Sequence, residues 1–129
     1  MKKRDTRQKN IILDVMKDNC NTHLTVCEIF KLAQEIDSTI GQATVYRNIK
    51  KFVEEGKVYL VKTRMGIDYY DWHNNHIHFE CLKCNRIFNV EDDELFLELR
   101  GRFKNHKNMI TDYKVTLEGY CEKCCEERK

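Results

Sequence analysis

The sequence contains no proline, no internal repeat and no low-complexity segment, and its apolar runs are short. A membrane-spanning helix needs about 20 predominantly apolar residues, so an integral membrane protein is not indicated. The first residues, Met1-Lys2-Lys3-Arg4-Asp5-Thr6, lead into a polar amphipathic stretch and lack the apolar core of a signal peptide. The HExxH motif of zinc hydrolases is also missing. These absences predict a cytoplasmic protein without a membrane partner.

Cysteine, in contrast, is well represented, with seven residues in a chain of 129. In a reducing cytoplasm, cysteines in CxxC pairs indicate metal or redox chemistry rather than a disulfide framework. A chain of this length forms one or two small domains with modest cores, which a metal ion or a partner subunit helps to stabilise.

Charge is unevenly distributed along the chain. Residues 1–64 carry 13 Lys and Arg against 8 Asp and Glu, whereas residues 65–129 carry 10 against 13. A basic first half beside an acidic second half suits a nucleic-acid-binding module joined to a different one, although many soluble domains have a basic face.

Two CxxC pairs carry the strongest chemical signal: Cys81 with Cys84, and Cys121 with Cys124. Each pair brings two thiolates within reach of one ion, and together they supply the four ligands of a tetrahedral zinc site. A redox role is the alternative, but it usually needs one pair at the start of a helix. Cys125 could replace Cys124 in a shifted register. The isolated Cys20 and Cys27 are interpreted as small buried hydrophobic residues.

A second cluster just before the first pair offers nitrogen and oxygen ligands, from Asp71, His73, His76 and His78. His76 and His78 alternate along a predicted strand, so both imidazoles point to the same side. A closed thiolate site beside an open histidine–carboxylate site predicts one structural and one exchangeable metal, and hence a metal sensor.

The first half has the pattern of three helices followed by a hairpin. Amphipathic spacing predicts helices over residues 6–18, from Thr25 to Ile36, and after Gly41 as far as a C-terminal cap at Gly56. Thr25 and Glu28 form a capping box. Residues 58–63 and 67–71 read as two strands. This order is typical of a winged helix-turn-helix, whose third helix enters the major groove of DNA. The alternative is a plain helical bundle.

The second half has an α+β pattern. A polar segment, residues 72–77, is followed by strands over 76–82 and 86–90, a helix over about 92–103, a strand over 110–117 and the last CxxC pair. The predicted organisation is a DNA-binding domain (1–71), a hinge (72–77) and a dimerisation and metal-binding domain (78–129).

These features together resemble the ferric uptake regulator family of metal-dependent repressors. The segments that carry the resemblance are Gln42-Ala-Thr-Val-Tyr-Arg-Asn-Ile49, His76-Ile-His-Phe-Glu-Cys-Leu-Lys-Cys84 and Gly119-Tyr-Cys-Glu-Lys-Cys124. The resemblance implies an N-terminal winged helix, a C-terminal α/β dimerisation domain with a four-cysteine zinc site, and a homodimer on a palindromic double-stranded operator. It also implies that a regulatory metal bound to both domains acts as corepressor.

The resemblance further implies a ligand set for the regulatory metal: His23, Asp71, His76 and His78. Asp68 is the fallback for Asp71. A second carboxylate of the family is replaced here by Asn89, an uncharged and weaker ligand. Asn89 itself, Glu80 and His73 remain candidates for an additional ligand. Tyr120 stands where a third metal site of the family would need a histidine.

The same resemblance places the DNA contacts on the third helix. Arg47 can read guanine or bind phosphate, and Tyr46 can pack on thymine methyl groups. Gln42, Thr44 and Lys50 are further candidates. An N-terminal arm that includes Lys2 and Arg4 could reach the minor groove, or could equally be an ordinary solvated terminus.

Three classes of function therefore compete: a metal-dependent regulator, a metalloenzyme, and a structural zinc-binding interaction module without sensing. The sequence shows no evident general base, which argues against a metalloenzyme. A purely structural module would leave the histidine cluster unexplained. Nitrogen and oxygen ligands favour Fe²⁺ or Mn²⁺ as the regulatory ion, hence an iron or peroxide regulator, with Zn²⁺ as an alternative.

Overall fold

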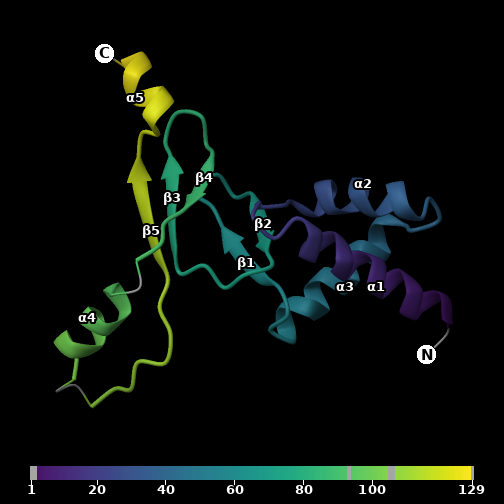
Figure 1. Cartoon of the computed structure of the whole chain (residues 1–129), viewed down its shortest axis with the longest axis horizontal. Coiled ribbons are helices and arrows are strands. Elements are labelled where there is room, and N and C mark those ends of the chain that lie inside the picture. The colour runs from purple at the N-terminus through teal and green to yellow at the C-terminus, as the bar shows by residue number, and fades with distance from the viewer. Residues whose placement is uncertain (1–2, 93, 105–106, 129) are drawn as a thin grey trace. The chain divides into compact units, whose positions relative to one another are not determined.

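The computed structural model describes residues 3–92, 94–104 and 107–128, and the chain divides into two compact units, Met1–Asn74 and Asn75–Lys129 (Figure 1). Unit 1 contains the helices α1 (Lys3–Asp18), α2 (Val26–Ile36) and α3 (Gln42–Glu54), and the strands β1 (Tyr59–Lys62) and β2 (Asp68–Asp71). In the described part of the chain, no helix is both long and apolar enough to cross a membrane.

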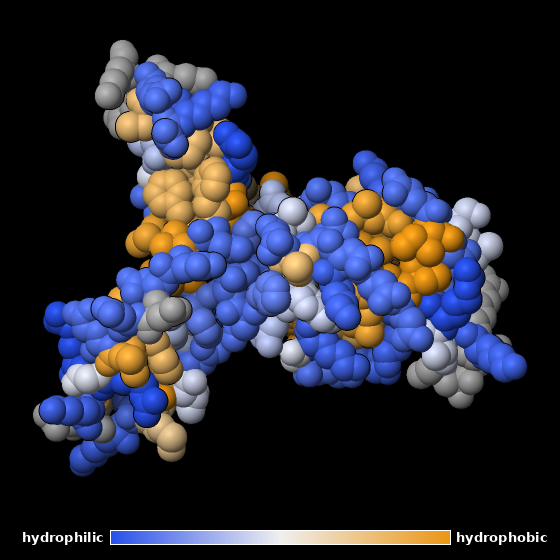
Figure 2. Space-filling view, viewed as in Figure 1, coloured by the Kyte–Doolittle hydropathy of each residue, from blue (hydrophilic) through white to orange (hydrophobic). Residues whose placement is uncertain are grey.

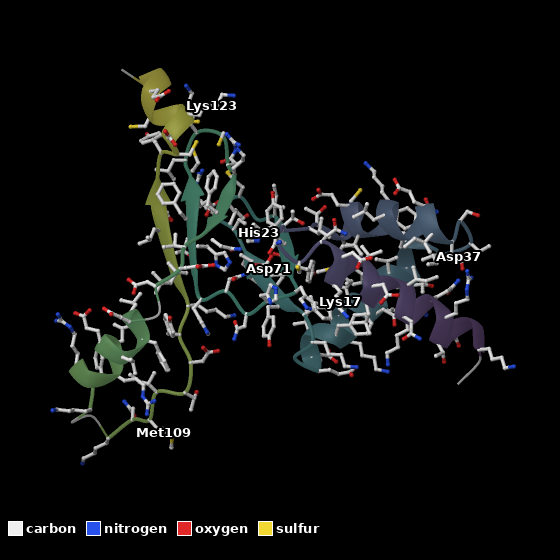
Figure 3. The ribbon with its side chains drawn as sticks, in the orientation of Figure 1. Lys17, His23, Asp37, Asp71, Met109 and Lys123 are labelled. Atoms are coloured by element: carbon white, nitrogen blue, oxygen red, sulfur yellow. The ribbon has the colours of Figure 1, made fainter. Side chains whose placement is uncertain are left out.

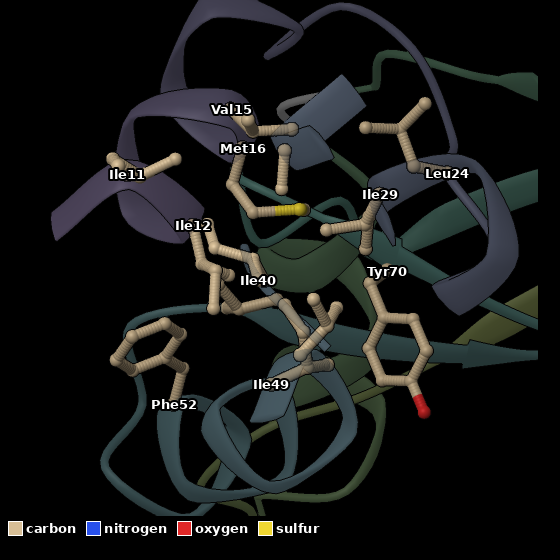
Figure 4. Packing of buried hydrophobic residues seen from close by; sticks show 13 residues of the cluster. Ile11, Ile12, Val15, Met16, Leu24, Ile29, Ile40, Ile49, Phe52 and Tyr70 are labelled. Atoms are coloured by element: carbon tan, nitrogen blue, oxygen red, sulfur yellow. The ribbon is translucent and has the colours of Figure 1, made fainter. Parts of the chain in front are cut away.

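The three helices of unit 1 enclose one hydrophobic core (Figure 4). Ile12 of α1, Ile29 of α2, and Ile49 and Phe52 of α3 are fully buried in it. These positions follow the helical spacing in the sequence, which explains why the three helices were predictable. The apolar spacing of α2 also predicts Ile36 on the inward face, but this last residue of the helix is 54% exposed, so that prediction is wrong.

The ends of α2 and α3 carry the caps that the sequence predicts. Thr25 accepts a hydrogen bond from the Glu28 backbone N–H while the Glu28 carboxylate accepts one from the Thr25 N–H, which completes the capping box. At the end of α3, Gly56 has φ of +73°, and its N–H donates to the Val53 carbonyl. The Lys57 N–H donates to the Phe52 carbonyl, so α3 ends in a Schellman motif.

The cysteines outside the CxxC pairs differ from the prediction. Cys27 is exposed and Cys20 is half-buried. On α2 the buried positions are Ile29 and Ala33, and Cys27 lies two residues before Ile29. Because successive helix residues are about 100° apart, that offset turns Cys27 away from the core.

The hairpin β1–β2 closes unit 1 and is tied to the segment before α2. The two strands are antiparallel, with Tyr59 opposite Asp71. An isolated antiparallel bridge joins Leu24 to Tyr70 through two backbone hydrogen bonds of 3.3 and 2.7 Å. This bridge fixes the end of β2 against the chain that precedes α2.

Unit 2 is a three-stranded sheet with two helices. Its strands are β3 (Ile77–Cys81), β4 (Ile87–Asn89) and β5 (Val115–Gly119), in the order β4-β3-β5, and its helices are α4 (Leu95–Arg102) and α5 (Glu122–Arg128). β3 is antiparallel to β4 and parallel to β5. A parallel neighbour requires a long crossover, which here contains α4.

The sheet has one apolar and one polar face. Phe79 on β3 lies opposite Phe88 on β4 and Leu117 on β5, so the three share a face. Phe88 is 37% and Leu117 46% exposed, and Figure 2 shows hydrophobic side chains gathered beside α5. The other face carries His78 and Glu80, both buried.

Two features of unit 2 depart from the sequence prediction. The strand predicted over 110–117 begins only at Val115, where pairing with Ile77 of β3 begins. The helix α5 was not predicted, since Glu122–Arg128 has no apolar periodicity. It places the second CxxC pair at the start of a helix, as a redox role would need, but all four cysteines lie in one cluster, which favours zinc. The helix predicted at about 92–103 is present but shorter.

Candidate metal centres

The four cysteines of the two CxxC pairs meet in unit 2. Cys81 ends β3, Cys84 lies in the turn that follows, Cys121 comes directly after β5, and Cys124 lies on α5. Their sulfur atoms all lie within 4.8 Å of one another. The Sγ atoms of Cys84 and Cys121 are 3.8 Å apart. A tetrahedron with Zn–S bonds of about 2.3 Å has edges of about 3.8 Å, so the cluster fits a zinc ion. Cys125 is exposed and is not in the cluster.

Neighbouring groups shift the pKa values of these thiols in different directions. The backbone N–H of Cys121 (3.4 Å) is the main cause that lowers the pKa of Cys81 to about 5, and the N–H of Cys84 (3.5 Å) adds to it. The side chain of Arg86 lowers the pKa of Cys84. Burial raises the pKa of Cys124 to about 12. A divalent cation at the centre of the cluster would hold all four as thiolates, as structural zinc sites require.

A histidine–carboxylate pair lies in unit 1. Because Leu24 bridges Tyr70, their neighbours His23 and Asp71 face one another, and His23 Nδ1 lies 2.6 Å from Asp71 Oδ1 (Figure 3). Both side chains are largely buried, at 11% and 2% exposed. Asp68, the fallback carboxylate, is exposed at the start of β2. The structure thus pairs His23 with Asp71 rather than with Asp68.

The remaining candidate ligands, apart from His73 in unit 1, lie on or beside β3 and β4 in unit 2. His78 and Glu80 are buried on one face, and Asn89 of β4 lies directly opposite His78. Glu80 lies opposite Ile87 and Glu118. His76 precedes β3 and is half-buried, with its Nδ1 3.2 Å from the Tyr113 carbonyl oxygen. His73 is exposed.

Sequence reasoning missed two groups that act on these sites. Arg86 follows the first CxxC pair by two residues, and a basic residue there was a signal that could have been noticed. The Asp112–Tyr113 segment contacts His76 from 36 residues away, and no sequence pattern marks it.

Helix α3 presents the predicted DNA-contacting side chains. Val45, Ile49 and Phe52 face the core, whereas Tyr46 and Arg47 are exposed, with Tyr46 at 56%. The Arg47 guanidinium donates to the Thr44 hydroxyl at 3.3 Å. Gln42 and Lys50 are also exposed. Lys2 and the side chain of Arg4, predicted for the N-terminal arm, lie outside the described residues.

A recess of about 260 Å³ lies beside the DNA-contacting residues, between α1 and α3. Lys9, Arg47 and Lys51 line it, together with the buried side chain of Gln8. Three basic side chains thus line this recess, together with the acidic Asp5.

Comparison with known proteins agrees with this architecture. The sequence model of the ferric uptake regulator family matches residues 1–118. The chain belongs to this family. Members of the family are metal-responsive transcriptional regulators rather than enzymes.

Individual relatives are distant but match over most of their length. The ferric uptake regulation protein of Bacillus subtilis is 28% identical over 129 residues, which cover 92% of this chain and 83% of that protein. The Campylobacter jejuni peroxide stress regulator is 25% identical and superposes with a TM-score of 0.77, covering 94% and 91% of the two chains. The Helicobacter pylori ferric uptake regulator Fur, at 21% identity, has the same fold, with a TM-score of 0.82 and coverage of 95% and 83%.

Proposed function

We propose that this protein is a metal-dependent, DNA-binding transcriptional repressor in which a metal ion acts as corepressor. The observation that carries the proposal is the buried His23–Asp71 pair in the same unit as the exposed Tyr46 and Arg47 of α3. The carboxylate and the imidazole are hydrogen-bonded at 2.6 Å, so a small separation of the two atoms would bring them to the roughly 3 Å that lies between two ligands of one ion when metal–ligand bonds are about 2.1 Å. Family membership supplies the regulatory context.

The proposed ligand set of the regulatory ion is His23, Asp71, His76 and His78, with Glu80 or Asn89 as candidates for an additional ligand. All of these donors are nitrogen or oxygen, which suits Fe²⁺ or Mn²⁺ better than a soft ion, and Zn²⁺ remains the alternative. When bound, the ion would join ligands of the DNA-binding domain (1–71) to His76 in the hinge (72–77) and His78 after it. The zinc held by the four cysteines of the dimerisation domain (78–129) has a structural role.

In this proposal the metal ion regulates DNA binding because its affinity differs between two conformations of the protein. A ligand shifts a conformational equilibrium only if it binds one state more tightly than the other. An ion that takes ligands from both sides of the hinge binds best when those ligands are together, and so favours the DNA-binding arrangement of a homodimer on a palindromic operator. Because bacterial operators are cytoplasmic, the proposal places the protein in the cytoplasm.

The experiment that tests the proposed function is DNA binding with and without metal. A palindromic duplex is first selected from a randomised pool with the metal-loaded protein, and its affinity is measured by fluorescence anisotropy. We expect Mn²⁺ or Fe²⁺ to tighten binding by about 5- to 150-fold relative to mildly chelated protein. Equal affinities with one tight zinc per chain would support the structural zinc module instead.

The apolar face of the unit 2 sheet supports the proposed homodimer. Phe88 and Leu117 are partly exposed on either side of Phe79, and an apolar face of this kind is usually covered by another surface. We expect Leu117→Glu to shift the protein from dimer to monomer in analytical ultracentrifugation, because the change introduces a charge at the covered face. Met65→Glu, at a residue 54% exposed in unit 1, is the control and should leave the dimer intact. If the Leu117→Glu variant remains a dimer, the dimer interface does not include this face.

Helix α3 leads to a separate prediction about DNA. Arg47→Ala should weaken binding to the selected duplex by about 10- to 100-fold if Arg47 reads a base, since a bidentate arginine–guanine contact contributes about 1–3 kcal/mol. Lys50→Ala should instead reduce the slope of log K against log salt by about 1. Lys31→Ala on α2, also exposed, is the control. Unchanged affinity and slope in both α3 variants would show that α3 is not the recognition helix.

A further inference from the structure

The segment between α4 and β5 holds the ring of His76 from two sides. His76 Nδ1 lies 3.2 Å from the Tyr113 carbonyl oxygen and 3.3 Å from Asp112 Oδ1. The His76 ring stacks on the Tyr113 ring, with centroids 4.6 Å apart and planes 13° apart. Tyr113 in turn stacks on Phe96 of α4, at 4.7 Å and 7°. The hydrogen bond to the Tyr113 carbonyl therefore fixes one ring nitrogen, the Asp112 carboxylate (56% exposed) lies within ion-pair distance of the same atom, and the aromatic stack fixes the plane of the ring.

The chemistry of these partners determines which nitrogen carries the hydrogen. A peptide carbonyl oxygen only accepts hydrogen bonds, and an ionised carboxylate does the same. The His76 Nδ1 between them must therefore be the N–H donor. In the neutral imidazole the other nitrogen, Nε2, then has the free lone pair, which is the form a metal ligand needs.

We propose that Asp112 is a positioning residue for the regulatory metal, which keeps His76 in the Nδ1–H tautomer so that Nε2 is the metal-binding nitrogen. The inference rests on the proposed function, in which His76 is a ligand. Metal-binding histidines generally donate their second ring N–H to a carboxylate or a backbone carbonyl, and loss of that partner weakens metal binding. Here both kinds of partner are present at one nitrogen.

Asp112 also adds a negative charge, besides that of Glu80 on the strand face. Asn89, opposite His78, is an uncharged amide where a carboxylate would strengthen the binding of a divalent cation. A carboxylate beside the far nitrogen of His76 would orient the imidazole toward the ion without itself binding it. The negative charge is thus placed behind the ligand instead of beside the metal.

Asp112 has a second contact that the experiment must separate from this role. Its Oδ1 also accepts the Tyr113 backbone N–H at 2.8 Å, which shapes the turn before β5. An asparagine keeps an oxygen for that hydrogen bond but has no charge. Asp112→Asn therefore tests the effect on His76, and Asp112→Ala removes both contacts. Glu91→Gln, at another exposed carboxylate of unit 2, controls for the loss of one negative charge.

The first measurement is the tautomer of His76 in zinc-loaded protein without the regulatory metal, from the nitrogen-15 shifts of the histidine ring. We expect the Nδ1–H form in the wild type and in Glu91→Gln, and a mixture of tautomers in Asp112→Ala. The second measurement is Mn²⁺ affinity by competition with a chelating dye. We expect it to fall by about tenfold or more in Asp112→Ala and by a smaller factor in Asp112→Asn, with Glu91→Gln unchanged.

Three results would overturn the role of Asp112 alone: an Nε2–H tautomer of His76 in the wild type, a pure Nδ1–H tautomer in Asp112→Ala, which would assign the tautomer to the Tyr113 carbonyl, or a Mn²⁺ affinity of Asp112→Asn within about twofold of the wild type. If the wild type keeps the Nδ1–H tautomer but binds no second metal ion, the proposed function itself is wrong, and the metal role of Asp112 is lost with it. The tautomer measurement therefore separates the two failures.

Discussion

Cys121→Ser should release the structural zinc and unfold unit 2. Cys121 is buried, its sulfur lies 3.8 Å from that of Cys84, and its backbone N–H donates to the Cys81 sulfur. Unit 2 has little other core, since its buried hydrophobic cluster consists of Cys81, Cys121 and Cys124 with Phe79 packed against it. Zinc binding in such small modules contributes on the order of 10 kcal/mol to folding. The free energy lost with one ligand therefore exceeds the free energy of unfolding expected for a unit of this size.

The measurements are zinc content by mass spectrometry and thermal unfolding followed by circular dichroism. Cys125→Ser is the matched control, because Cys125 is adjacent to Cys124 but exposed and outside the cluster. We expect one zinc per chain in the wild type and in Cys125→Ser, and none in Cys121→Ser, which should also lose the dimer. Zinc retained by Cys121→Ser and lost by Cys125→Ser would show that the ligand register is shifted.

Asp71→Asn should remove the response of DNA binding to metal while leaving the zinc in place. Asp71 is 1% exposed and faces His23 at 2.6 Å, so the substitution keeps the shape of the side chain and deletes the charge. An amide oxygen is a weaker ligand for a divalent ion than a carboxylate. We expect Mn²⁺ affinity to fall by at least about tenfold, and metal no longer to tighten binding to the selected duplex.

Asp68→Asn is the control for this experiment, because Asp68 lies on the same strand and is exposed. It should respond to Mn²⁺ as the wild type does. If Asp68→Asn abolishes the response and Asp71→Asn retains it, the ligand assignment must be exchanged between the two carboxylates. Circular dichroism of both variants should match the wild type, which would assign the loss to the metal and not to unfolding.

Much of unit 1 could be predicted because its signals are local. The capping box at Thr25, the Schellman motif at Gly56 and the helical spacing of Val45, Ile49 and Phe52 each lie within a few residues of one another. Contacts of this range are encoded in short sequence patterns. The winged-helix order of elements followed from them.

The parts of unit 2 that escaped prediction depend on contacts between distant residues. Helix α5 begins directly after Cys121 and has no apolar stripe of its own, so only the geometry of the thiolate cluster accounts for its place. The start of β5 is the point at which it pairs with β3, with Val115 opposite Ile77, 38 residues earlier in the chain. The two CxxC pairs were recognised from spacing alone, because a zinc site needs those residue types at that separation. The contact of Asp112 with His76 has no comparable signature.

The central claim is that metal and DNA are coupled, and the most direct measurement is the Mn²⁺ affinity of the zinc-loaded wild type with and without the selected duplex. Thermodynamic linkage requires each ligand to strengthen the binding of the other by the same factor. The account predicts that the duplex tightens Mn²⁺ binding by about 5- to 150-fold, equal to the factor by which Mn²⁺ tightens DNA binding. A Mn²⁺ affinity that is the same with and without DNA would contradict it.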